Sequence, residues 1–127
     1  MKLACHPLKS IPLLSRLTQE DWRRFQELAQ AHEYRAGNGL FYQGNSPLGL
    51  HFIASGRVKL IKEDRAGRCQ IVRIVHGPDL LGDRAFFAEK PYACTGEVME
   101  DSSISFLQPG HFWALYGRNP DMSRLLT

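Results

Sequence analysis

The stretch that decides the fold is residues 77–98, which read Gly-Pro-Asp-Leu-Leu-Gly-Asp-Arg-Ala-Phe-Phe-Ala-Glu-Lys-Pro-Tyr-Ala-Cys-Thr-Gly-Glu-Val. This pattern is typical of a strand, a glycine, one short helical turn, a loop and a second strand. Gly82 ends an apolar pair, Asp83 suits a position at or beside a helix N-terminus, and residues 85–88 can form the turn. Such a turn presents unpaired backbone N–H groups and the positive end of a helix dipole, which together can hold a phosphate.

Short segments rich in β-branched and aromatic residues lie upstream of this stretch. They comprise residues 48–54, 57–62 and 69–75, and glycines punctuate them at Gly44, Gly56, Gly67 and Gly77. Strands of this length, with turn residues about every 8–12 positions, are typical of a small antiparallel sandwich or barrel. We therefore expect a β-roll over about residues 31–107, interrupted by the phosphate-type turn.

Helix signals flank the predicted roll on both sides. Thr18 suits an N-cap, Asp21 the third helical position, and Leu17 and Trp22 a hydrophobic staple, which predicts a helix over about residues 18–30. Its apolar residues recur at helical spacing, so one face should pack on the roll. A second helix is expected from about residue 109, and a third from Asn119, where the chain ends within two turns.

Composition sets limits on the class of protein. The 127 residues, 43% hydrophobic and 23% charged, predict one globular domain over residues 1–127. No apolar run approaches the roughly 18 residues of a membrane span, and no signal peptide opens the chain, so a cytoplasmic location without membrane contact is expected. The net charge of +3 is too mild to hold nucleic acid by itself, and the basic clusters at residues 23–24 and 59–68 are interpreted as solvated faces.

Several segments of the chain together resemble one protein family. Residues 37–56, Gly-Asn-Gly-Leu-Phe-Tyr-Gln-Gly-Asn-Ser-Pro-Leu-Gly-Leu-His-Phe-Ile-Ala-Ser-Gly, with Arg-Val-Lys-Leu after them, look like the first half of a cyclic-nucleotide-binding domain of the Crp/Fnr transcription-regulator family. Residues 82–87 and 92–95 resemble its phosphate-binding cassette, and residues 103–115 resemble the strand and helix that follow. The similarity spans about residues 10–127.

The resemblance implies a mainly β fold with flanking helices, a double-stranded, jelly-roll-like β-roll that feeds a long dimerisation helix. The segment from Asn119 matches the start of that helix, so the chain is expected to be truncated there, without the C-terminal helix-turn-helix domain. It implies a homodimer in the full-length context, with DNA bound only through the absent domain. The 127 residues alone are therefore not expected to bind duplex DNA sequence-specifically.

The cassette resemblance implies a set of ligand-binding residues, and two of them depart from the cyclic-AMP-binding pattern. Relatives that bind cyclic AMP use a Glu for the ribose hydroxyl and an Arg for the cyclic phosphate, where this chain has Asp83 and Tyr92. Because Tyr offers one neutral hydrogen bond instead of a charge-assisted pair, cyclic AMP is not expected to bind in the usual way. Arg84 either supplies the missing charge from another direction or faces solvent and pairs with Asp83 or Glu89. The implied set is Gly82, Asp83, Arg84, Ala85, Tyr92, Ala93 and Cys94.

The identity of the effector stays open. The Tyr-x-x-Thr pattern of residues 92–95 looks more like the Fnr-type branches of the family, whose members respond to gases, redox state or other ligands. An iron–sulfur cluster needs about four thiolates, and the three scattered cysteines, expected to be reduced thiols, do not provide them. A haem sensor needs an axial ligand, for which His51 on a predicted strand is the candidate. Cys94 is the candidate redox-sensitive thiol, with a small apolar role as the alternative.

An enzyme is the competing class. Cupin-type metalloenzymes need His-x-His plus a carboxylate, which this chain lacks, and the order of residues predicts no catalytic triad and no metal site. We therefore expect a non-enzymatic, effector-sensing domain of a Crp/Fnr-type regulator. Its effector would be a cyclic nucleotide or another small ligand bound in the roll, with haem as the further option and no cofactor certain. A stand-alone ligand-binding or interaction domain remains the alternative.

Overall fold

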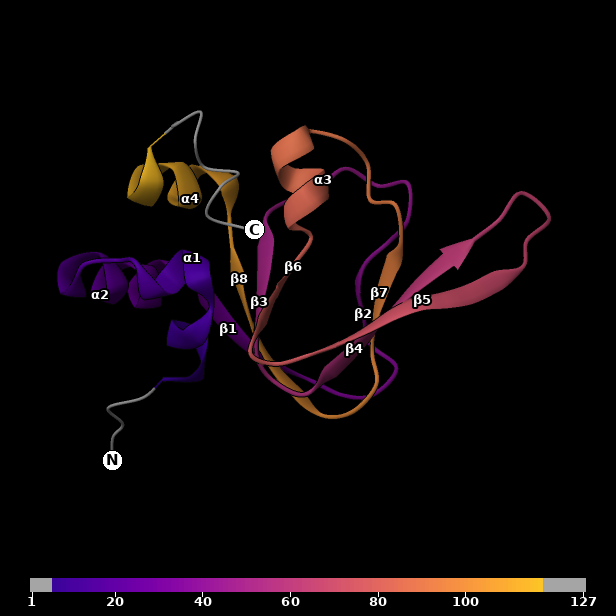
Figure 1. Cartoon of the computed structure of the whole chain (residues 1–127), viewed down its shortest axis with the longest axis horizontal. Helices are drawn as coiled ribbons and strands as arrows, with labels where there is room; N and C mark the ends of the chain where they lie inside the picture. Colours follow the sequence, from indigo (N-terminus) through magenta and orange to yellow (C-terminus); the bar gives the residue numbers. More distant parts are fainter. Residues whose placement is uncertain (1–5, 118–127) are drawn as a thin grey trace.

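The computed structural model describes residues 6–117, which form a two-sheet β-roll with α1, α2 and α4 together on one side and α3 over the roll (Figure 1). The helical elements are η1 (Pro7–Ser10), α1 (Pro12–Ser15), α2 (Gln19–Leu28), α3 (Asp83–Ala88) and α4 (Pro109–Tyr116). The strands are β1 (Gln30–Tyr34), β2 (Gly39–Phe41), β3 (Leu50–Ser55), β4 (Arg57–Glu63), β5 (Cys69–His76), β6 (Asp79–Leu81), β7 (Thr95–Val98) and β8 (Ser102–Leu107).

The strands form two antiparallel sheets of four. One has the order β1-β8-β3-β6 and the other β2-β7-β4-β5, so successive strands alternate between the sheets except at the β4–β5 hairpin. The register pairs Ile53 with Ile104 between β3 and β8, and Val58 with Val98 between β4 and β7. This arrangement confirms the mainly β, β-roll fold predicted from the glycine spacing.

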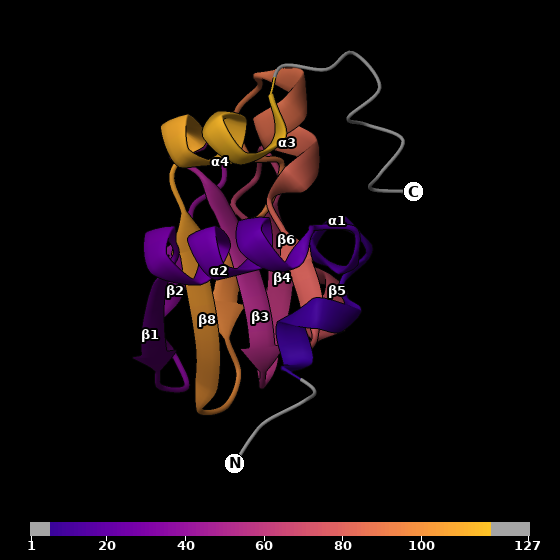
Figure 2. The same ribbon diagram turned by 90° about the vertical axis from the view of Figure 1, so that its left-hand side faces the viewer.

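Helix α2 lies across the outer face of the β1-β8-β3-β6 sheet (Figure 2). It begins as predicted, because the Thr18 side chain accepts a hydrogen bond from the backbone N–H of Asp21 at 3.1 Å. Trp22 and Phe25 on its inner face are buried. The helix ends at Leu28, slightly before the predicted end, because Ala29 adopts an extended conformation and Gln30 already pairs with β8.

Two apolar clusters hold the fold together. The first joins the helices to one face of β3 and β8, and includes Phe25, Phe52 and Phe112, all at most 1% exposed. The second lies between the two sheets and includes Ile53, Val58, Val98 and Ile104. Since Phe52 and Ile53 point into different clusters, β3 is buried on both faces.

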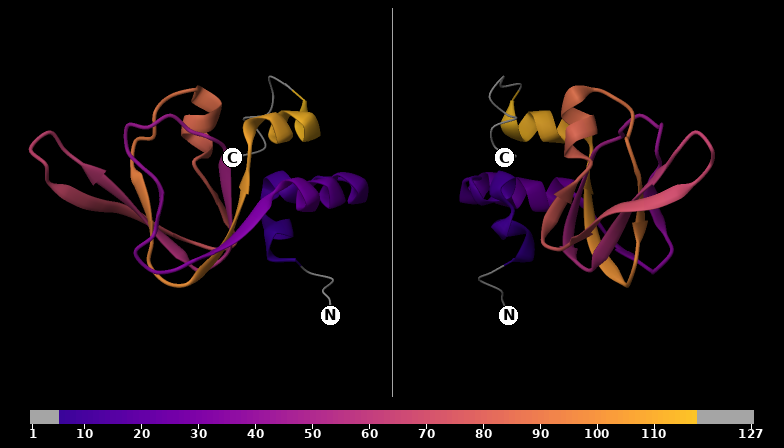
Figure 3. Two further views of the ribbon diagram at one scale, coloured as in Figure 1. Left: turned by 180° about the vertical axis from the view of Figure 1, so that it is seen from behind. Right: turned by 45° about the vertical axis from the view of Figure 1, so that its right-hand side comes forward.

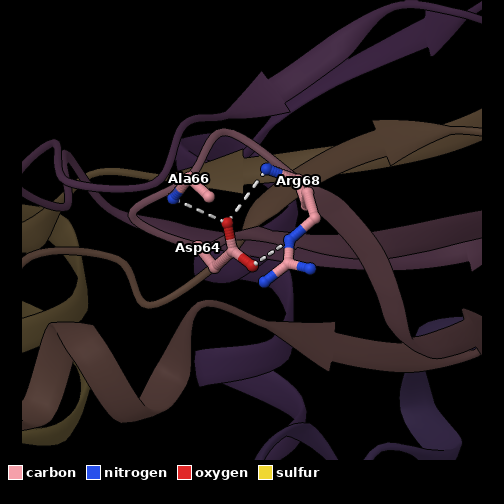
Figure 4. A network of polar contacts seen from close by, with 3 residues as sticks. All are labelled: Asp64, Ala66 and Arg68. Atoms are coloured by element: carbon pink, nitrogen blue, oxygen red, sulfur yellow. Dashed lines mark hydrogen bonds and ion pairs between the residues drawn. The ribbon is translucent and has the colours of Figure 1, made fainter.

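The β4–β5 hairpin projects from the rest of the roll (Figure 3). Its turn is closed by Asp64, whose carboxylate accepts hydrogen bonds from the backbone N–H groups of Ala66 and Arg68 and from the Arg68 guanidinium, at 2.9–3.1 Å (Figure 4). These bonds, the one from the Arg68 backbone first, hold the pKa of Asp64 below its usual value. These hydrogen bonds thus close the turn although its residues are exposed.

Most predicted elements are confirmed, with shifts at their ends. The predicted strand over 48–54 begins only at Leu50, and the helices expected at residues 85–88 and from 109 are α3 and α4. The short helices η1 and α1 were not predicted, and the helix expected from Asn119 lies outside the described residues. Within residues 6–117 no helix is long and apolar enough to cross a membrane.

Candidate functional site

A cavity of about 950 Å³ lies beside α3. Residues 79–85 and 90–94 form one wall, and Leu60, Val72 and Arg73 of the β4–β5 hairpin form another. Phe41 adds an aromatic surface, and residues 11–13 approach from the helical end. The cavity thus joins the cassette to the projecting hairpin.

All the residues predicted from the cassette resemblance line this one cavity. They are Gly82, Asp83, Arg84, Ala85, Tyr92, Ala93 and Cys94. A second hollow, of about 590 Å³, lies between α3 and α4, and none of these residues lines it. The sequence therefore identified a set of residues that the fold brings together.

The path of the chain into α3 depends on Gly82. Its φ of 82° lies in the left-handed region, where side chains are disfavoured, and a Cβ there would stand 3.3 Å from Cε1 of Tyr92. Its carbonyl accepts the first helical hydrogen bond, from Phe86 N–H at 3.0 Å. A glycine at this position lets the backbone turn directly against the Tyr92 ring.

Tyr92 is buried, with only 6% of its surface exposed to solvent. Its ring stacks on Phe41, with centroids 4.3 Å apart, and its backbone exchanges hydrogen bonds with Gly44 and Asn45 at 2.9 Å. Burial raises the pKa of its hydroxyl, against a backbone hydrogen bond with Leu48, so the side chain is neutral at pH 7. Tyr92, at the position where the resemblance implies an arginine in cyclic-AMP-binding relatives, is here part of the apolar floor of the cavity.

The rim of the cavity carries charges of both signs. Asp83 is half-buried, and burial raises the pKa of its carboxyl, while the positive charges of Arg84 and Arg73 lower it and Asp79 raises it. The Asp79 carboxylate itself accepts a hydrogen bond from Leu80 N–H at 2.7 Å. An apolar floor under a charged rim suits a small molecule with an apolar body and a polar group.

Sequence reasoning missed the hairpin side of the cavity. Leu60, Val72 and Arg73 lie outside the cassette, and only the alternation of Arg73 with Val75 in a predicted strand hinted that this arginine shares the inward face. Arg84 is exposed and lines the cavity, without a direct ion pair to Asp83 or Glu89 within 4.0 Å. The predicted ion pair of Arg84 with Asp83 or Glu89 is therefore wrong, and the role of Arg84 in supplying positive charge to a ligand stays a prediction.

His51, the candidate haem ligand, sits on β3 but does not line the cavity. Its ring packs between Phe41 and Phe106, with centroids 5.6 and 4.9 Å away, and its Nδ1 is buried without a hydrogen-bond partner. Burial lowers its pKa to about 4, so the imidazole is neutral at pH 7. This placement gives the haem hypothesis no support from the cavity.

The thiols and the candidate metal ligands are dispersed. Cys94 lines the cavity and is partly exposed, Cys69 is exposed on β5, and both are free thiols. In the part of the chain that the structure describes, no three His, Cys, Asp or Glu side chains are placed to hold a metal ion.

Comparisons with known proteins give this geometry a family. The cyclic nucleotide-binding domain model matches residues 31–119. An uncharacterised protein of Haemophilus influenzae is 31% identical over 87 residues, 68% of this chain and 67% of that protein. The cyclic AMP receptor protein of Thermus thermophilus is 26% identical over 113 residues, 89% of this chain and 52% of the receptor.

A solved structure agrees with the sequence comparison. The crystal structure of the Thermus thermophilus catabolite activator protein matches with a TM-score of 0.77 at 25% identity, over 91% of this chain and 54% of that one. The chain thus spans about half the length of the two Thermus proteins. Because the family model covers residues 31–119 of 127, the chain belongs to the cyclic nucleotide-binding domain family, with Crp-type transcription regulators among its relatives.

Proposed function

We propose that this chain is the effector-sensing domain of a Crp/Fnr-type transcription regulator and that the cavity beside α3 holds the effector. The observation that carries the proposal is that the seven cassette residues line one cavity in a chain of this family. The regulatory character of the relatives also favours a binding role over an enzymatic one.

The proposed signal is a shift between two conformations of the domain. A ligand changes such an equilibrium only through its different affinities for the two states. The cavity wall combines α3 with the projecting β4–β5 hairpin, so a bound ligand would fix the position of one relative to the other. In the proposed homodimer this change would reach the helix expected from Asn119 and, through it, a DNA-binding domain.

Tyr92 makes cyclic AMP a weak effector in this proposal. Without the charge-assisted pair, the desolvated phosphate would lose about 2–4 kcal/mol, or roughly 30-fold to 1000-fold in affinity. A micromolar site would then become nearly millimolar. A neutral tyrosine stacked on Phe41 suits the aromatic or aliphatic body of a ligand better than its phosphate.

Calorimetric titration of the chain with cyclic AMP, cyclic GMP and cyclic di-GMP tests the proposal, together with absorbance spectra after addition of haem. We expect cyclic AMP to bind with a dissociation constant near millimolar or weaker. A low-micromolar constant would mean that Arg84 or another group replaces the missing arginine, contrary to the weak binding proposed. A stoichiometric haem spectrum would instead favour the haem-sensing alternative.

A further inference from the structure

Two arginines from different elements line the cavity without a direct ion pair. Arg73 belongs to β5 and Arg84 to α3. Among the described residues, the ion pairs within 4.0 Å join Arg24 to Asp21, Arg57 to Glu100, Lys59 to Glu97 and Arg68 to Asp64. The guanidinium groups of Arg73 and Arg84 take no part in them, so both are available to an anion.

Strand alternation points Arg73 into the cavity, on the same face as the buried Val75, and a β-bulge adds Val72. Leu60 of β4 pairs with Arg73, but the next residue, Ile61, pairs with Ile71, which leaves Val72 as the extra residue on β5. In a bulge of this kind, two successive side chains lie opposite one residue of the partner strand. Val72 and Arg73, both opposite Leu60, line the cavity together with it. Regular alternation alone would have sent Val72, and not Arg73, to the outer face.

The charges around the cavity favour an anion at its mouth. The charged residues that line it are the cationic Arg73, Arg84 and Lys90 and the anionic Asp79 and Asp83, a net charge of +1. Arg73 and Arg84 both line the cavity, and the positive charge of each lowers the pKa of the Asp83 carboxyl. A guanidinium binds carboxylate, phosphate and sulfonate groups in a charge-assisted geometry that Tyr92 cannot provide.

We infer that Arg73, together with Arg84, binds the charged group of the effector, and that the effector is a small organic anion with an apolar body. This inference rests on the proposed function, because it assigns the charge recognition of the same cavity. The apolar body lies on the floor formed by Leu60, Phe41 and Tyr92. The anion is thus bound from the hairpin and from α3, and not from the cassette position that Tyr92 occupies.

A pair of matched fluorescent probes tests the inference. Anilinonaphthalene sulfonate and phenylnaphthylamine share one aromatic body, and only the first carries a negative charge. Dissociation constants for both are measured by fluorescence with the unmodified chain and with Arg73→Gln, Arg73→Lys and Arg65→Gln. Arg65 is the matched control, because it is exposed on the same hairpin and does not line the cavity.

The inference predicts that Arg73→Gln weakens binding of the sulfonate about tenfold and leaves the neutral probe within about twofold. Arg73→Lys should retain part of the preference, since it keeps the charge but loses the planar fork. Thermal melting of each variant shows that the fold is intact.

The contrary outcomes separate the two levels of the proposal. If both probes bind and Arg73→Gln behaves like Arg65→Gln, the role of Arg73 is wrong while the cavity remains a ligand site. If neither probe binds to the unmodified chain, the proposed function fails, and the inference fails with it.

Discussion

The helical end of the molecule, formed by η1, α1, α2 and α4, buries its large apolar side chains. The β4–β5 hairpin leaves several of its own exposed. Phe25, Phe52 and Phe112 are at most 1% exposed in the cluster that joins the helices to β3 and β8. On β5, by contrast, Ile71 and Val72 are 52% and 48% exposed. The first region carries much of the stability of the fold, whereas the second leaves apolar surface open beside a cavity.

The position of each strand in the sheets explains the difference. β3 lies between β8 and β6, with helices on one face and the second sheet on the other, so both of its faces are closed. β5 is an edge strand that pairs only with β4 within its sheet. An edge strand can move or accept a ligand without disturbing a packed core.

Replacing a core ring should produce the largest effect. We expect Phe52→Ala to lower the free energy of unfolding by about 3–5 kcal/mol, because it leaves a cavity and removes the edge-on contact with Phe25, whose centroid is 5.1 Å away. Urea denaturation measures the change. Ile71→Thr on the open strand is the control and should stay within about 0.5 kcal/mol. Equal losses in the two variants would remove the distinction between the regions.

Restoring the family pattern in the cassette should have the next largest effect. The double variant Tyr92→Arg with Asp83→Glu should bind cyclic AMP roughly 30-fold to 1000-fold more tightly, because it supplies a charge for the phosphate. It should also be less stable, since Tyr92 is buried against Phe41. Calorimetry gives the affinity, and Tyr92→Phe, which keeps the ring, should change it less than about twofold.

Unchanged affinity in the double variant with an intact fold would contradict the cassette interpretation. The turn after Gly82 would then not present its side chains to the ligand as the resemblance implies.

The elements predicted best are those whose signals are local. Thr18 and Asp21 lie within one helical turn, and the cassette residues from Gly82 to Cys94 are close along the chain, so one short stretch contained both the turn and most of the site. The short helices η1 and α1 have too few residues to show a helical period.

Arg73 could not be assigned to the site from its sequence alone. Alternation with Val75 indicates its inner face, but only the pairing of β5 with β4 sets the neighbours, Leu60 and the bulged Val72, that make this face a cavity wall. Most residues of β5 are exposed on both faces, so its apolar residues, taken together, do not alternate in a way that would mark the inner face. Non-local pairing therefore accounts for the missed wall of the cavity.

His51 predicts a pH dependence of the closed region. In the unfolded chain its pKa is about 6.5, and in the fold burial lowers it to about 4, so the unfolded state binds more protons between these values. Stability should therefore be full above pH 6.5 and fall as the pH drops towards 4, by up to about 3 kcal/mol from this residue.

The substitution His51→Leu isolates this contribution. The variant should lose less stability than the unmodified chain between pH 7 and pH 4, as measured by urea denaturation at each pH, because its side chain cannot take up a proton. His32→Gln is the control, since His32 is exposed. Parallel curves for the unmodified chain and His51→Leu would show that the buried imidazole does not titrate as proposed.

The helix cap should give the smallest effect. Thr18→Ala removes the hydrogen bond to Asp21 N–H and should cost about 1 kcal/mol. Gln19→Ala, at the neighbouring exposed position, is the control in the same denaturation experiment. A loss no larger than that of Gln19→Ala would mean that the cap contributes nothing to α2.

The most direct test of the ligand cavity is an NMR titration of the isotopically labelled chain with cyclic AMP, raised to several millimolar. We expect weak, fast-exchanging binding, with backbone amide shifts concentrated in residues 79–85, in residues 90–94 and around Arg73. The amides of α2 and β1 should stay unchanged. Shifts confined to η1, α2 and α4, with none in residues 79–85 or 90–94, would contradict the assignment of this cavity as the effector site.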